Sequence, residues 1–92
     1  MKKKIAILGS TGSIGKTTFN IIKNNPKDFE IVVLTTNKNS TIILRQAKLL
    51  NVKNIIISNE IEYLKLKKKL KNSKIKVHNN LDSLQNIFKK KI

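Results

Sequence analysis

The residues best placed to do chemistry in this sequence lie in one stretch, ILGSTGSIGKTTF, at positions 7–19. Its glycines, Gly9, Gly12 and Gly15, follow a short apolar run and precede a helical pattern. Glycines at this spacing are typical of a dinucleotide-binding turn, in which the backbone approaches a pyrophosphate at a helix N-terminus. Counted back from Lys16, the stretch also approximates the GxxxxGK[ST] loop that binds nucleoside triphosphates. The two loops imply different ligands.

The triphosphate loop fits these residues less well than the dinucleotide turn. It needs a glycine five positions before Gly15, where this sequence has Ser10. It also needs an acid at the end of a neighbouring strand to hold magnesium, but the candidate strand ends in Ser58 and Asn59 before Glu60 opens the next helix. We therefore favour the dinucleotide turn, with a P-loop-like nucleotide-binding protein as an alternative.

The end of the second expected strand distinguishes the two nicotinamide dinucleotides. A site for NADH normally carries an acid there, about 20 residues after the glycines, to bind the ribose hydroxyls. An acid would repel the 2′-phosphate of NADPH, whereas hydroxyl, amide and ammonium groups would bind it. The sequence has no acid in this turn, which reads Thr35, Thr36, Asn37, Lys38, Asn39. It therefore predicts a preference for NADPH.

Apolar segments alternate with helical patterns and would position these turns. We predict strands over 4–8, 30–36 and 53–58, a brief strand over 74–77, and helices over 13–24, 37–51, 59–72 and 81–92. Strands joined through helices form right-handed crossovers and a parallel sheet. The predicted fold is α/β, the first half of a Rossmann-like doubly wound sheet with three or four strands.

Helical periodicity also predicts the core-facing side chains of the first three helices, and capping residue types predict the N-terminal caps of the first two. The expected core-facing residues are Ile14, Thr18, Ile21 and Ile22, then Ile43, Ala47 and Leu50, then Ile61, Leu64 and Leu70. The expected caps are Ser13 or Thr11 for the first helix and Ser40 or Thr41 for the second.

Composition limits the kinds of site that the chain can build. Its 92 residues amount to one small domain. It has no cysteine, which excludes disulfides, thiol catalysis and zinc–thiolate sites. A single His78 and five acids argue against a metal cluster or a paired-carboxylate centre, so we predict neither catalytic nor metal-binding residues. No apolar stretch is long enough for a membrane span, and we expect a cytoplasmic protein with no membrane partner.

The net charge of +15 raises the question of nucleic-acid binding. Of the 20 basic residues, however, only Arg45 is an arginine, and aromatic residues make up 4% of the chain. Nucleic-acid surfaces favour arginine for bidentate contacts and aromatic rings for stacking. We therefore interpret the lysines as a solvated surface and keep a small basic α/β nucleic-acid-binding module as a second alternative.

A family resemblance rests on these same residues. GSTGSIG at 9–15, followed by NNPKDFEIVVLTTNKN at 24–39, resembles the amino terminus of the 1-deoxy-D-xylulose 5-phosphate reductoisomerases, with Asn25, Pro26 and Phe29 in the same order and spacing. The resemblance implies that Thr11, Gly12, Ser13 and Ile14 contact the cofactor pyrophosphate and its neighbourhood, and that Lys38 and Asn39 bind the 2′-phosphate. Asn37 stands where the family usually has glycine. We expect the turn to survive because asparagine tolerates positive φ better than most residues.

The resemblance also implies an activity that a longer chain would perform. The family rearranges 1-deoxy-D-xylulose 5-phosphate and reduces it with NADPH to 2-C-methyl-D-erythritol 4-phosphate, in non-mevalonate isoprenoid biosynthesis. It uses a divalent metal, Mg or Mn, and is typically homodimeric. We expect residues 1–92 to form a partial NADPH-binding domain that is inactive alone, without the family's catalytic and C-terminal domains. Half a sheet would leave an exposed strand edge, so we expect marginal stability and a tendency to associate.

Overall fold

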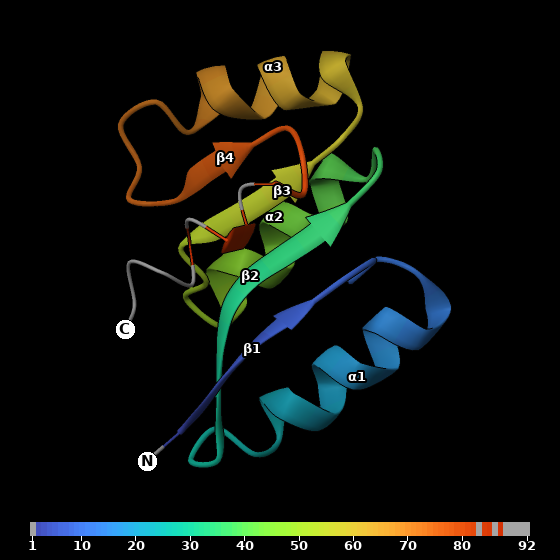
Figure 1. Cartoon of the computed structure of the whole chain (residues 1–92), viewed down its shortest axis with the longest axis vertical. Coiled ribbons are helices and arrows are strands. Elements are labelled where there is room, and N and C mark those ends of the chain that lie inside the picture. The colour runs from blue at the N-terminus through green and yellow to red at the C-terminus, as the bar shows by residue number, and fades with distance from the viewer. Residues whose placement is uncertain (1, 83, 86, 88–92) are drawn as a thin grey trace.

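The computed structural model describes residues 2–82, 84, 85 and 87. Helices and strands alternate along this part of the chain, as predicted (Figure 1). The elements are β1 (Lys3–Ile7), α1 (Ser13–Lys23), β2 (Phe29–Thr36), α2 (Ser40–Leu49), β3 (Asn54–Ile57), α3 (Glu60–Lys69) and β4 (Lys76–His78). The four strands pair in parallel in the order β1-β2-β3-β4. The predicted Rossmann-like α/β half-sheet is therefore confirmed.

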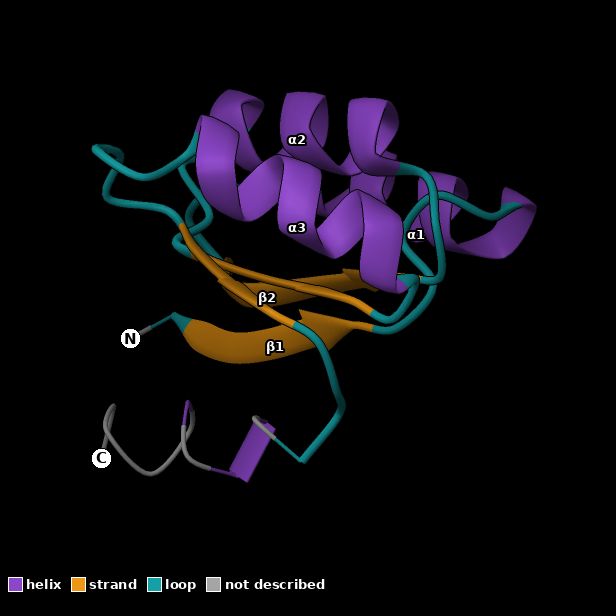
Figure 2. Cartoon of the chain, turned by 90° about the horizontal axis from the view of Figure 1, so that it is seen from above, coloured by secondary structure: helices purple, strands orange, loops and turns teal. Residues whose placement is uncertain are grey.

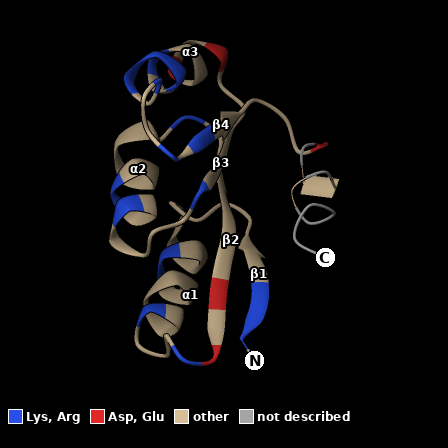
Figure 3. Ribbon diagram, turned by 90° about the vertical axis from the view of Figure 1, so that its left-hand side faces the viewer, with Lys and Arg blue, Asp and Glu red and all other residues tan. Residues whose placement is uncertain are grey.

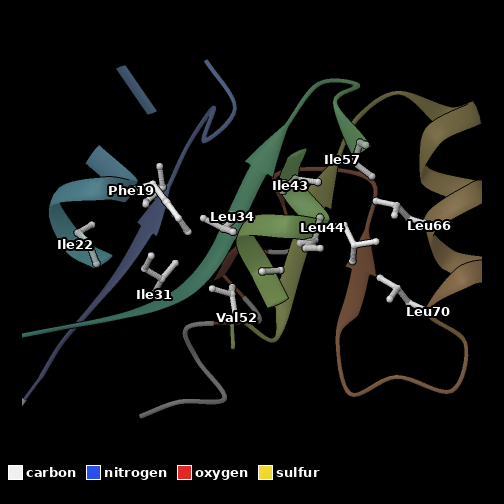
Figure 4. Close-up of a cluster of buried hydrophobic side chains, with 13 residues drawn as sticks. Phe19, Ile22, Ile31, Leu34, Ile43, Leu44, Val52, Ile57, Leu66 and Leu70 are labelled. Carbon is white, nitrogen blue, oxygen red and sulfur yellow. The ribbon is translucent and has the colours of Figure 1, made fainter. Parts of the chain in front are cut away.

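The three helices α1, α2 and α3 lie on one face of the sheet (Figure 2). This follows from the strand order, because every right-handed crossover to the next strand outward returns on the same side. The main core lies between the helices and the sheet, around Leu34, Ile43 and Ile57 (Figure 4). On the opposite face, Leu84 and Ile87 contribute to a second apolar cluster. The central strands are thus buried on both faces, which explains their unbroken apolar runs.

A register shift in β2 decides which face its side chains reach. Ile5 of β1 pairs with Ile31, but the next residue, Ala6, pairs with Val33, so β2 carries one extra residue. As a result Ile31 and Leu34 both belong to the helix-side core, while Val32 and Val33 belong to the cluster on the other face.

The predicted core face of α1 is wrong in part. Ile14 is 83% exposed and Ile21 is also exposed, whereas Gly15, Phe19 and Ile22 are buried. The helix is rotated by one position from the apolar pattern because Gly15 packs against the turn that follows β1. Phe19 and Ile22 lie four and seven residues later, on the face that Gly15 sets.

The predicted face of α3 is also wrong in part. Ile61 is 67% exposed and Leu64 is 55% exposed, while Leu66 and the expected Leu70 are buried in the main core. The run of lysines in this helix leaves few apolar residues, so spacing alone could not select the buried leucine. For α2 the prediction is confirmed at Ile43 and Ala47, which are fully buried, and Leu50 packs partly buried at its end.

The helix starts differ from the predicted caps. Gly12 precedes α1 and no side chain caps that helix. At α2 the cap is Asn39, whose Oδ1 accepts a hydrogen bond from the Ile42 N–H at 3.3 Å, and Ser40 is the first helical residue. The last strand spans 76–78 rather than 74–77. The helix expected over 81–92 falls largely outside the described residues.

Replacement of two leucines on α3 tests this assignment of its buried face. Leu66→Ala should lower the free energy of unfolding by about 2–5 kcal/mol, because it opens a cavity in the core. The matched control Leu64→Ala, at an exposed position of the same helix, should change it by about 0.5 kcal/mol or less. Urea denaturation followed by circular dichroism measures both. Equal losses would contradict the observed helix rotation.

Candidate functional site

The turn between β1 and α1 is built by its glycines. Gly9 has φ of 68°, in the left-handed region that side-chain-bearing residues adopt only with strain. The Gly12 N–H then donates to the Gly9 carbonyl at 3.1 Å, and the Lys16 N–H donates to the Gly12 carbonyl at 2.8 Å. The chain therefore reverses from strand to helix within a few residues.

Gly15 allows α1 to lie directly against this turn. A Cβ atom at Gly15 would stand 2.1 Å from the Gly9 carbonyl oxygen and 2.7 Å from the Ser10 Cα, which no side chain could occupy. A Cβ atom at Gly12 would meet the Gly9 carbonyl oxygen at 3.5 Å, an ordinary contact. Gly15 thus serves helix packing, while the exposed Gly12 leaves backbone open to a ligand.

The start of α1 has the features of an anion site. Gly12 has extended backbone angles and supplies no side chain to accept from the first N–H groups of the helix. The first turn also contains no acidic residue. These N–H groups lack intrahelical partners and carry the positive end of the helix dipole. The backbone over Gly12–Gly15 is therefore suited to hold a phosphate.

Hydrogen bonds tie the glycine turn to the end of β2. The Gly9 N–H donates to Thr35 Oγ1 at 2.9 Å, and the Ser10 N–H donates to the Thr35 carbonyl at 2.9 Å. The hydroxyls of Thr11 and Thr36 share a hydrogen bond of 2.7 Å. The turn is thus held in place by protein contacts alone, before any ligand binds.

The second turn, Asn37–Asn39, follows β2 at the same edge of the sheet. The Ser58 hydroxyl donates to Asn37 Oδ1 at 2.9 Å, and the Asn59 N–H donates to the Asn37 carbonyl at 2.7 Å. Among described non-glycine residues only Asn51 has a positive φ, so the expectation that Asn37 relies on tolerance of positive φ is wrong. Its side chain turns to the end of β3 instead.

The structure brings the predicted site residues to one edge through these contacts. Direct hydrogen bonds join the glycine turn to Thr35 and Thr36, and Asn37 follows them in the chain. Lys38 and Asn39 are exposed there. Sequence reasoning did not identify Thr35 and Ser58 as anchors of the two turns. The signal was available, since Thr35 lies near the end of β2 and Ser58 directly follows β3, each after an apolar run.

An open hollow of about 730 Å³ lies along β1 and the start of α1. Its lining includes Leu8, Gly12, Ser13 and Ile14. Ile14, which was expected both in the core and at the cofactor, is therefore placed on the outer, ligand-accessible side of the turn. An apolar wall beside phosphate-binding backbone suits a ligand with both a ring system and phosphates.

Charges around the site are mostly positive. Lysines are distributed over the three helices, and α2 begins with no acid in its first turn (Figure 3). One acidic residue, Glu62 of α3, contacts the start of α2. Its Oε1 accepts a hydrogen bond from the Ser40 hydroxyl at 2.6 Å, and its Oε2 lies 3.2 Å from Lys65 Nζ. The hydrogen bond from Ser40 and the contact with Lys65 lower the pKa of Glu62.

The described residues contain no group of three or more His, Cys, Asp or Glu side chains that could hold a metal ion. No helix among them is long and apolar enough to span a membrane. His78 is half-buried on β4, where its Nε2 lies 3.3 Å from Asn54 Oδ1.

Comparison with known proteins gives a consistent result. The model of the family 1-deoxy-D-xylulose 5-phosphate reductoisomerase matches residues 5–92. The enzyme of that name from Pelagibacter ubique is 54% identical over 86 residues, covering 94% of this chain and 22% of the relative. The one from Buchnera aphidicola of Schizaphis graminum is 49% identical over 74 residues, covering 80% and 19%.

Solved structures agree with the sequence relatives. The reductoisomerase from Zymomonas mobilis in complex with NADPH superposes with a TM-score of 0.82 at 30% identity, over 95% of this chain and 23% of that one. A structure of DOX-P reductoisomerase with NADPH, fosmidomycin and magnesium gives 0.80 at 29% identity, over 92% and 21%. The chain thus spans about a fifth of the length of the proteins it matches.

Two alanine substitutions separate the roles of the glycines. Gly15→Ala should lower the free energy of unfolding by about 1–3 kcal/mol, because its Cβ overlaps the Gly9 backbone and forces α1 away from the turn. Gly12→Ala should leave stability within about 0.5 kcal/mol, since its Cβ makes only an ordinary contact. Thermal melts of both variants test this. A destabilised Gly12→Ala beside an unchanged Gly15→Ala would contradict the geometry.

Acid titration tests the contact between α2 and α3. Because the pKa of Glu62 is lower in the folded chain, its contribution is fully present above the unfolded-state pKa and is lost as pH falls through the folded-state value. Glu62→Gln should therefore be less stable than the parent at pH 7, and the two should converge below pH of about 4. Ser40→Ala should shrink this gap. Urea midpoints measured from pH 7 to 3 would contradict the assignment if the gap stayed constant.

Proposed function

Because this chain belongs to the 1-deoxy-D-xylulose 5-phosphate reductoisomerase family, we propose that it binds NADPH at the edge of the sheet where the turns after β1 and β2 meet. The observation that carries this proposal is the glycine turn fixed on Thr35 and Thr36, next to a second turn with no acidic residue. The family fold supports it, since two structural neighbours with this fold are complexes with NADPH.

The proposed contacts divide between the two turns. Backbone N–H groups over Thr11–Gly15 bind the pyrophosphate, and the exposed Ile14 packs against an apolar part of the cofactor. Gly9 and Gly15 determine the shape of this turn and do not themselves contact the phosphates. Lys38 supplies an ammonium group to the 2′-phosphate, and Asn39 and the backbone of Asn37 complete that contact.

The reaction itself is proposed for the longer protein of which such a domain is a part. There, 1-deoxy-D-xylulose 5-phosphate is rearranged and then reduced with hydride from NADPH to 2-C-methyl-D-erythritol 4-phosphate. The described residues offer no ligand set for the magnesium found in related structures, so they do not fit a metal site. We assign to residues 1–92 a partial NADPH-binding domain, and to the segments beyond it the metal, the sugar phosphate and the chemistry.

The remaining assignments follow the family. We propose a cytoplasmic location and a homodimer for the full-length enzyme. The P-loop and nucleic-acid alternatives receive no support from the family model or the relatives. In the turn itself, the side chain of Ser10, which occupies the place of the first P-loop glycine, is completely buried.

Calorimetric titration of the chain with NADPH, NADH and magnesium-ATP tests the proposal. NADPH should bind in clear preference to the other two nucleotides. Lys38→Ala should lower the affinity for NADPH about tenfold and leave the affinity for NADH unchanged, because a charge-assisted contact to the 2′-phosphate is lost. Lys48→Ala, which removes an exposed lysine in the last turn of α2, is the matched control and should retain the parent affinity.

Two results would overturn the proposal. Equal affinity of the parent for NADPH and NADH would contradict the proposed contact with the 2′-phosphate. A failure of the folded parent to bind any of the three nucleotides would contradict the proposed nucleotide site as a whole.

A further inference from the structure

One buried polar side chain, Gln46 of α2, reaches the glycine turn. It is 6% exposed, and its Nε2 donates a hydrogen bond of 2.8 Å to the carbonyl of Ser10, 36 residues earlier in the chain. Its Oε1 is buried without a hydrogen-bond partner among the described residues. A buried amide that is only half satisfied costs stability compared with an apolar residue. Core packing alone would therefore not favour glutamine at this position.

Ser10, the residue that Gln46 contacts, is held from three elements. Ser10 is completely buried, and its N–H donates to the Thr35 carbonyl of β2. Gly15 of α1 lies so close that its Cβ position is 2.7 Å from the Ser10 Cα. Gln46 adds the contact from α2. Ser10 is thus the residue where both neighbouring helices and the second strand meet the turn.

Peptide geometry shows what the Gln46 contact does. In a planar trans peptide the carbonyl and the following N–H point in opposite directions, and no peptide bond in the described part of the chain is cis. Because Gln46 holds the Ser10 carbonyl on the buried side, the N–H of Thr11 in the same peptide must face the other way, towards the ligand side of the turn. An N–H fixed in this direction needs no reorganisation when an anion binds.

We propose that Gln46 is a positioning residue for the phosphate-binding turn, which aims the Thr11 N–H at the pyrophosphate of the dinucleotide. This inference rests on the proposed NADPH site and deepens it. It also makes a claim about the ligand-free chain, namely that Gln46 holds the Ser10–Thr11 peptide in one orientation.

Three glutamine variants provide the test. Gln46→Met keeps the length of the side chain but has no hydrogen-bond donor, and it should lower the affinity for NADPH about tenfold. Gln46→Glu keeps the shape and donates only when its carboxyl group is protonated. Gln85→Met replaces an exposed glutamine and is the matched control.

A pH series separates positioning from packing. NADP⁺, which is stable in acid, replaces NADPH, and each affinity is divided by that of the parent at the same pH to remove the titration of the ligand phosphate. The affinity of Gln46→Glu for NADP⁺ should rise towards that of the parent as pH falls from 8 to 5.5, because the protonated carboxyl group can donate a hydrogen bond to the Ser10 carbonyl. Gln46→Met should stay weak throughout. Ser10 itself carries no group that titrates in this range.

Amide hydrogen exchange gives a readout that needs no ligand. The Ser10 N–H, which donates to the Thr35 carbonyl, belongs to the same residue whose carbonyl Gln46 holds. In Gln46→Met this N–H should exchange at least tenfold faster than in the parent, because the turn loses one of its anchors, while amides of β3 keep their rates. If exchange rose equally at both places, or if the variant matched the parent in exchange and in affinity, the positioning role would be overturned. If exchange changed as expected but the parent bound no dinucleotide, the role in the turn would stand and the proposed function would fail.

Discussion

The contact on which the rest of this structure depends is the approach of Gly15 to the backbone of Gly9 and Ser10. Because no Cβ separates them, α1 packs directly on the turn that follows β1. That approach sets the rotation of the helix, so Phe19 and Ile22 enter the core and Ile14 faces outward. A single steric constraint therefore decides both the packing of α1 and the surface that the candidate site presents.

The parallel sheet supplies the second requirement, which is that two turns far apart in sequence lie together. Parallel neighbours end at the same edge, so the residues after β1, β2 and β3 are adjacent. Polar residues at those ends then lock the turns to one another, as Thr35 does for Gly9 and Ser58 does for Asn37. These hydroxyl groups add to the backbone hydrogen bonds that hold the same two turns.

Sequence reasoning recovered what local pattern determines and missed what tertiary contact determines. Strand and helix positions, parallel pairing and the glycine turn follow from apolar runs and turn residues, so they were predictable. The faces of α1 and α3 were not, because the rotation of α1 depends on the Gly15 contact and the lysine-rich α3 has too few apolar residues to define a stripe. The Gln46 contact spans 36 residues, and no local pattern indicates it.

Asn37 shows when a position in such a turn does not need glycine. A glycine is indispensable only where φ is positive or where another chain segment fills the Cβ position, as at Gly9 and Gly15. Neither condition applies to Asn37, whose side chain is exposed and accepts a hydrogen bond from Ser58. The Asn37 amide is held towards the end of β3. The Ser58 hydroxyl and the Asn59 N–H, which donate to its side chain and its carbonyl, therefore fix this turn without a glycine.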